Sequence, residues 1–127
     1  MGRRIPIVGS SDSHGTDPAS YFGLGRTIVF AKDMELESIC KAVKDMYSVA
    51  IEQQPGEDVE RVFGSYRLVK YARFLLDQYF PAHNELCVEE GILMREYALG
   101  DGEAAQRLAA LANRTELYMR KILKGQS

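Results

Sequence analysis

The apolar residues of this 127-residue chain follow one pattern up to about residue 56 and a different one beyond it. The first part has short runs rich in β-branched and aromatic residues, which are typical of strands. These runs are Ile5–Gly9, Arg26–Ala31 and Tyr47–Gln53. Asp33 opens a segment with apolar residues three and four apart, which predicts an N-cap and a helix with one apolar face. We therefore expect a small β-sheet with a packed helix.

Beyond residue 56 the spacing of apolar residues is helical. Glu57 to Phe80 carries two apolar stripes, which predicts a helix covered on more than one side. Pro81 suits the first turn of a second helix, while Gly100 suits its end and Asp101 the cap of a third. We expect the three helices to share one hydrophobic core. Its expected centre is Val62, Tyr66, Val69, Leu93 and Leu108.

The two patterns together predict an α+β fold in two parts. Residues 1–56 form the small sheet with its packed helix, and residues 57–127 form a three-helix array. The length is sufficient for a compact domain that buries a sizeable core.

The composition argues against a protein that binds nucleic acid and against one that spans a membrane. The 16 basic and 18 acidic residues give a net charge of −2, which lacks the basic excess of proteins that grip nucleic acid, so no nucleic-acid partner is expected. No apolar run reaches the ~20 residues that span a bilayer, so no membrane partner is expected either. Cys40 and Cys87 each lie in an apolar helical pattern outside any CxxC pair. We expect both thiols to be reduced and packed, in a cytoplasmic protein.

One short string carries candidate chemistry: Gly9 to Gly15, which reads Gly-Ser-Ser-Asp-Ser-His-Gly. Asp12 and His14 stand two residues apart after a predicted strand, so their side chains can point the same way. A carboxylate and an imidazole together suit Zn, Mn or Fe. The alternative is a polar turn, in which Asp12 accepts hydrogen bonds from nearby backbone N–H groups and His14 is merely exposed.

This string resembles the last of the four signature motifs of the PHP (polymerase and histidinol phosphatase) family. The run from Gly25 to Ala31 and the helix after it resemble the segment that comes next in members of that family, so the resemblance covers the chain roughly to Ile51. The helical second half is similar to an extension found in some bacterial members.

The resemblance implies a distorted α/β barrel, of which the small sheet is one end, with a metal site at the C-terminal ends of the strands. It also implies divalent ions (Zn, Mn or Fe) that activate a water for hydrolysis of a phosphate ester. On this basis Asp12 and His14 are metal ligands.

Most of the family pattern is missing from this sequence. It has no H-x-H motif, and His83 is its only other histidine. We therefore expect the chain to be the C-terminal segment of a metal-dependent phosphoesterase. We expect this segment to be inactive alone, because it has no complete metal site of its own. No catalytic residue is assigned, and the substrate-binding residues are unknown. The alternative is a non-catalytic interaction or regulatory module with a helical tail.

Two further expectations concern partners. In a whole barrel, Ile5–Gly9 and Arg26–Phe30 would be interior strands, so their exposed edge is expected to pair with a second copy in a homodimer. A phosphate-ester substrate is expected for the whole enzyme of which this chain would be one segment. A set of basic residues is interpreted as the hydrated side of a helix rather than as a nucleic-acid strip, although in a whole enzyme some of them could reach a substrate phosphate. The set is Arg61, Arg67, Lys70 and Arg73.

Overall fold

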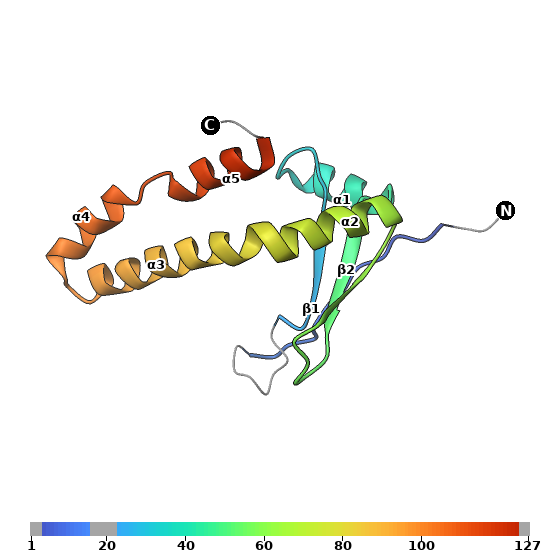
Figure 1. The fold of residues 1–127 in the computed structure, drawn as a ribbon, viewed down its shortest axis with the longest axis horizontal. Helices are drawn as coiled ribbons and strands as arrows, with labels where there is room; N and C mark the ends of the chain where they lie inside the picture. Colours follow the sequence, from blue (N-terminus) through green and yellow to red (C-terminus); the bar gives the residue numbers. More distant parts are fainter. Residues whose placement is uncertain (1–3, 16–22, 125–127) are drawn as a thin grey trace. The chain divides into compact units, whose positions relative to one another are not determined.

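The chain divides into a sheet-containing unit and a helical unit, which confirms the predicted α+β class. The computed structural model describes residues 4–15 and 23–124. Unit 1 is Met1–Arg73 and unit 2 is Phe74–Ser127 (Figure 1). The division therefore falls well beyond residue 57, where the change of sequence pattern occurs.

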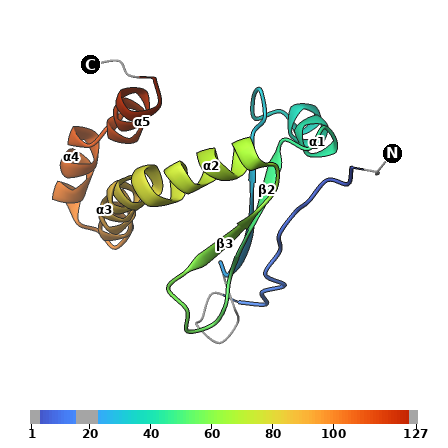
Figure 2. The ribbon, with the colours of Figure 1, turned by 45° about the vertical axis from the view of Figure 1, so that its right-hand side comes forward.

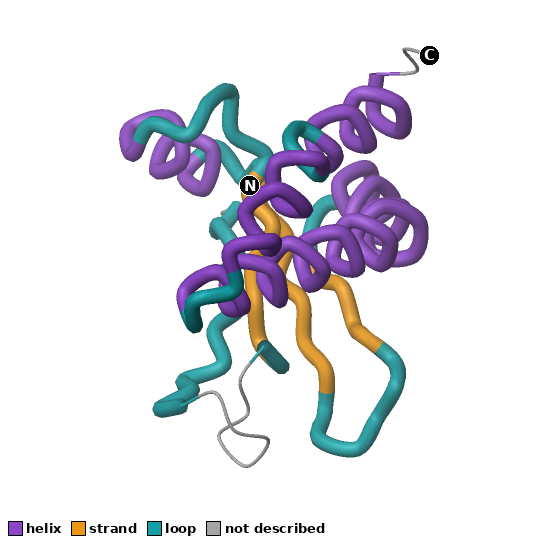
Figure 3. Tube along the Cα trace, turned by 90° about the vertical axis from the view of Figure 1, so that its left-hand side faces the viewer, coloured by secondary structure: helices purple, strands orange, loops and turns teal. Residues whose placement is uncertain are grey.

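The sheet of unit 1 has three antiparallel strands in the order β1-β2-β3 (Figure 3). The strands are β1 (Gly25–Val29), β2 (Ser48–Gln53) and β3 (Glu60–Phe63). The first two confirm the predicted strands over 26–31 and 47–53. On the central strand, Val49 and Ile51 are 0% and 1% exposed. Ile51 lies opposite Arg26 on β1 and opposite Val62 on β3. The core of this unit therefore surrounds β2.

Different segments cover the two faces of the sheet. Helix α2 (Tyr66–Phe74) covers the face of Val49 and Ile51, where the rings of Phe30 and Tyr71 lie 5.6 Å apart. The N-terminal segment crosses the other face (Figure 2). There the Ser48 hydroxyl donates a hydrogen bond of 2.7 Å to the carbonyl of Ile7. Ser48 and Ala50 are small enough for the backbone to pass over them, and both are buried.

Helix α1 (Leu36–Lys44) connects β1 to β2. Its N-cap is Glu35 rather than the predicted Asp33. Asp33 still contributes at this end, because its carboxylate accepts a hydrogen bond of 3.1 Å from the N–H of Glu35. At the other end Met46 has φ +66°, and the N–H of Tyr47 donates to the carbonyl of Ala42. This tight turn returns the chain to β2.

The strand predicted over Ile5–Gly9 is wrong. This segment is extended over a face of the sheet rather than alongside its edge, and it forms no ladder among the described residues. Its backbone is held instead by side chains, the hydroxyls of Thr27 and Ser48. An apolar run becomes a strand only where another strand edge pairs with its N–H and C=O groups.

The helix predicted over Glu57–Phe80 is wrong in its first part, because this stretch holds β3 before α2 begins. Ala50 and Glu52 of β2 pair with Phe63 and Arg61. The residues from 57 to 63 fit a helical spacing locally, but pairing with β2 decides their conformation. The tertiary partner therefore outweighs the local pattern.

Unit 2 is helical among its described residues, and α4 and α5 lie along α3 (Figure 1). Its elements are the π-helical turn η2 (Leu75–Tyr79), α3 (Phe80–Ala98), α4 (Gly102–Ala110) and α5 (Arg114–Lys124). The predicted cap at Asp101 is confirmed, since its carboxylate accepts a 2.9 Å bond from the N–H of Glu103. The single helix predicted after it is wrong: the chain breaks before α5, where Asn113 has φ +66°.

Pro81 lies in the first turn of α3, as predicted, but the backbone is already helical before it. The preceding turn is wide, with the N–H of Phe80 bonded to the carbonyl of Leu75. Proline has no N–H, and its ring clashes with the carbonyl four residues earlier in a regular α-helix. A π-helical turn is a known way to accommodate such an interruption.

The predicted common core of three helices is wrong. Leu93 is buried in unit 2 and Leu108 is half-buried, but Val62 belongs to β3. Tyr66, at the start of α2, is 77% exposed. The assumed helix over residues 57–80 placed these residues on one face, and the presence of β3 removes that relationship.

Candidate metal centre

The loop that carries Asp12 and His14 is fixed to strand β1 at its root. The Gly9 N–H donates to Thr27 Oγ1 at 2.8 Å, and the same hydroxyl donates to the Gly9 carbonyl at 2.9 Å. One threonine side chain thus satisfies both backbone groups of Gly9. The loop therefore starts from a defined position on the sheet.

Two glycines allow the loop to approach β1 this closely. A Cβ on Gly9 would lie 2.6 Å from the carbonyl oxygen of Arg26, and a Cβ on Gly25 would lie 2.5 Å from that of Ser10. Both contacts involve backbone atoms, which cannot rotate away as a flexible side chain can. Any larger residue would push the loop off the strand.

Beyond its root the loop is organised by short local contacts. Ser13 Oγ donates to the Gly15 carbonyl at 2.5 Å, while Asp12 has φ +51° and its N–H lies 3.5 Å from Ser10 Oγ. The left-handed backbone is uncommon for a residue with a Cβ, although Asp tolerates it better than most.

The side chains of Asp12 and His14 are exposed. Within residues 4–15 and 23–124, neither makes a hydrogen bond or an ion pair. The polar-turn interpretation requires the Asp12 carboxylate to accept bonds from backbone N–H groups, and no such bond joins it to a described residue. The loop thus presents two potential ligands that its own contacts leave available.

Those two groups fit a divalent cation by type but not by number. Carboxylate and imidazole are ordinary ligands of Zn, Mn and Fe. The described residues contain no group of three or more His, Cys, Asp or Glu side chains arranged to hold an ion. A closed site needs at least four ligands, so Asp12 and His14 form at most part of one.

The end of the sheet beside the loop has a further carboxylate and a guanidinium. A shallow pocket of about 380 Å³ is bordered by Ser10, Ser11, Gly25 and Glu52, among others. On the other face of the sheet Arg26 pairs with Glu60, and its guanidinium also donates to the Gly23 carbonyl at 2.8 Å. Burial lowers the pKa of Arg26, but an arginine remains charged in a folded protein. This ion pair links β1 to β3 across β2.

Sequence reasoning identified Asp12 and His14 but missed the residues that position them. Thr27 was assigned only to a strand, and its hydroxyl is what holds Gly9. The sequence did contain a signal for this anchor: Thr27 is a hydroxyl residue on the strand after the motif, two positions from Gly25.

The second histidine, His83, is half-buried in unit 2, with its ring 5.3 Å from that of Tyr79 and Nδ1 3.6 Å from Cys87 Sγ. The expectation that both cysteines are packed is wrong, since Cys40 and Cys87 are exposed free thiols.

The basic residues noted in the sequence are mostly engaged within unit 1. Arg61 pairs with Glu57 at 2.8 Å, and Arg73 donates to the Glu60 carbonyl at 3.2 Å. Lys70 lies 5.4 Å from the centre of the Tyr66 ring, a cation–π distance. These contacts favour a structural role for this set.

No protein-family model, curated protein or solved structure matches the chain. In the part of the chain that the structure describes, no helix is both long and apolar enough to cross a membrane.

Proposed function

We propose that this chain supplies Asp12 and His14 as two ligands of the divalent-metal centre of a PHP-type phosphoesterase. The observation that carries the proposal is the contrast within one loop. Its root is fixed by Thr27 and by close backbone contact, while its two ligand-type side chains are exposed and without a partner among the described residues. A pre-positioned backbone with free donor atoms is what a metal-binding loop requires.

The remaining ligands of such a centre come from a segment that is not in this sequence. Only two histidines are present, and His83 contacts Cys87 and Tyr79 in unit 2. The two exposed free thiols are compatible with a reducing compartment, and we place the protein in the cytoplasm on that basis.

Binding of Mn²⁺ to the loop tests the ligand assignment in the chain itself. Mn²⁺ prefers oxygen and imidazole donors, so it avoids the Cys87 thiol better than softer ions do. We expect addition of Mn²⁺ to broaden the NMR signals of residues 10–15 selectively. The broadening should be lost in Asp12→Asn and in His14→Gln, but retained in the matched controls Asp58→Asn and His83→Gln. Uniform broadening, or broadening that persists in Asp12→Asn, would contradict the assignment.

The chain alone is expected to lack phosphoesterase activity. Two ligands cannot position both a metal ion and the attacking water, and correct positioning accounts for much of the rate of such reactions. The measurement is hydrolysis of an aryl phosphate with added Mn²⁺. Turnover that disappears in Asp12→Ala would show that the chain holds a complete centre, and the proposal of a shared one would fall.

The second candidate function is a non-catalytic interaction module. It is favoured by a specific observation in unit 2, where α3 leaves large apolar side chains exposed. This candidate predicts no Mn²⁺ effect at the loop, so the NMR experiment separates the two functions.

A further inference from the structure

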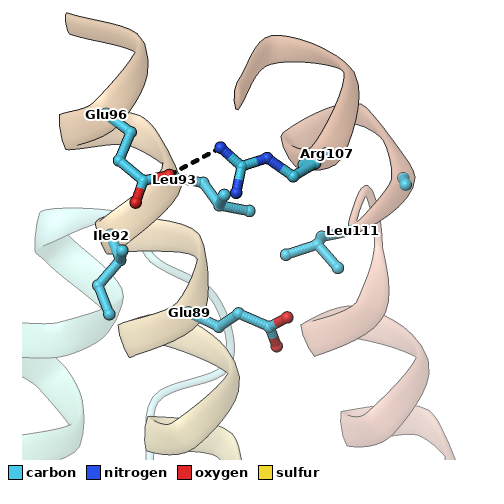
Figure 4. A pocket seen from close by; sticks show the side chains of 7 residues that line it. Glu89, Ile92, Leu93, Glu96, Arg107 and Leu111 are labelled. Atoms are coloured by element: carbon cyan, nitrogen blue, oxygen red, sulfur yellow. Dashed lines mark hydrogen bonds and ion pairs between the residues drawn. The ribbon is translucent and has the colours of Figure 1, made fainter. Parts of the chain in front are cut away.

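Apolar residues lie on every side of α3, but unit 2 covers only one side. Leu93 is the only buried residue of α3. In Figure 4 it points toward Leu111, whereas Ile92, which borders the same pocket between α3 and α4, points away from Leu111. Arg107 joins α4 to Glu96 of α3 by an ion pair of 2.9 Å. A helix that is apolar all round is normally covered all round, so α3 has a surface available for a further partner.

The uncovered surface is a regular stripe along α3, which we call the outer stripe. Its six residues follow one another at intervals of four, three, four, three and four, the spacing of a helix–helix seam. They are Pro81, Glu85, Val88, Ile92, Arg95 and Leu99, and all six are exposed. The three large apolar ones are 61%, 53% and 76% exposed, in chain order. Large apolar side chains grouped on a surface mark an interaction site.

The order of residues in the outer stripe is complementary to itself when reversed. If a second α3 lies antiparallel with the two-fold axis at the level of Glu90, Val88 faces Ile92 of the other copy. The same register places Glu85 opposite Arg95, and Pro81 opposite Leu99. Each contact occurs twice, as an isologous interface requires.

The two charges of the outer stripe have no ion-pair partner within the described residues. They cannot pair with each other on one helix, because ten residues of α-helix separate them by about 15 Å. In the antiparallel register, Glu85 of one copy lies opposite Arg95 of the other, next to the apolar pair of Val88 and Ile92. This self-complementarity favours a second copy of the chain as the partner, because an unrelated protein need not carry the matching residues in reversed order.

We propose that the outer stripe binds a second copy of this chain, with the two α3 helices antiparallel and Glu85 of each copy paired with Arg95 of the other. The contact lies entirely within unit 2. It goes beyond the proposed metal-loop function and does not depend on it.

Charge reversal at the two positions tests this arrangement by sedimentation equilibrium of the full chain. Wild type should show a monomer–dimer equilibrium. Glu85→Arg should weaken dimerisation at least about tenfold, and so should Arg95→Glu, because each places like charges opposite one another. An equimolar mixture of the two single variants should form a heterodimer, since the introduced arginine of the first then faces the introduced glutamate of the second. The Glu85→Arg, Arg95→Glu double variant should dimerise as wild type does.

Glu103→Arg is the matched control, because Glu103 is an exposed acid on α4 and not a member of the outer stripe. It should leave dimerisation unchanged. Circular dichroism of each variant checks that the helices are retained. A wild type that stays monomeric at all concentrations overturns the proposal. So does a dimer that is indifferent to both reversals, or a pair of weakened variants that fail to recover when mixed.

Discussion

The central elements of the two units, β2 and α3, differ in how fully the chain covers them. The first four residues of β2 are all buried, between the N-terminal segment on one face and α2 on the other. Helix α3 has nineteen residues and buries one of them. Both elements are rich in apolar side chains, so the difference lies in their surroundings rather than in their composition. Unit 1 completes a core around its central strand, whereas unit 2 covers its longest helix on one side only.

The largest expected effect compares the same residue type in the two settings. Ile51→Ala removes a side chain that is 1% exposed and should lower the free energy of unfolding by about 2–5 kcal/mol. Ile92→Ala truncates a half-exposed side chain and should cost less than about 1 kcal/mol in the monomer. Denaturant unfolding at low protein concentration measures both. Equal losses would show that α3 is covered as well as β2.

A second comparison uses glycines. Gly25→Ala forces a Cβ against the Ser10 backbone and should destabilise the protein by about 1–3 kcal/mol. On α3, a Cβ on Gly91 meets nothing within 4 Å, so Gly91→Ala should stabilise the helix by roughly 0.5–1 kcal/mol. The sign of the change in unfolding free energy is the readout. A stabilising Gly25→Ala would mean that the loop does not press on β1.

Much of this contrast could not be predicted from the sequence, because it depends on contacts between residues that are far apart along the chain. Local signals correctly predicted β1, β2 and the Asp101 cap, because a β-branched run or a capping side chain acts within a few residues. The conformation of residues 60–63 depends on pairing with β2, and that of Ile5–Gly9 on hydrogen bonds to Thr27 and Ser48 across a face of the sheet. These are properties of distant residues. At the loop, Asp12 and His14 were visible as residue types, but their anchor on Thr27 is a contact across eighteen positions.

A smaller effect is expected from the titration of Tyr79 in unit 2. Burial raises its pKa, with further contributions from Tyr118, whose ring stacks on it at 5.5 Å, and from Cys87. The folded state therefore holds the phenol proton more tightly than the unfolded state does. Stability from this source is present below the ordinary tyrosine pKa of about 10 and is lost as pH rises through the raised value.

The corresponding measurement is the thermal midpoint across alkaline pH. Tyr79→Phe should flatten the decline seen in wild type, whereas Tyr97→Phe, at an exposed position, should leave it unchanged. The explanation fails if the two variants follow the same curve.

The smallest expected effect concerns the sheet edge, which the sequence predicts as the dimer contact and in place of which we propose the outer stripe. β1 and β3 are the edge strands of the described sheet. The N–H of Val29 points away from β2, since its neighbour Phe30 is the one bonded to Tyr47. Val29→Pro would therefore block an added strand without removing a bond to β2.

We expect Val29→Pro to leave the dimer unchanged, because the proposed dimer contact is made by α3 and not by β1. Loss of the dimer in Val29→Pro, with no loss in Glu85→Arg, would assign association to the sheet edge instead.

The double hydrogen bond between Gly9 and Thr27 has a consequence for the time scale of loop motion. The amide hydrogen of Gly9 can exchange with solvent only when the root of the loop lifts from β1, so its exchange rate reports that opening. The amide of Asp12 donates to Ser10 Oγ at 3.5 Å, a long hydrogen bond that gives less protection. We therefore expect the Gly9 amide to exchange more slowly than the Asp12 amide, and the reverse order in a hydrogen-exchange experiment would show that Thr27 does not hold the root of the loop.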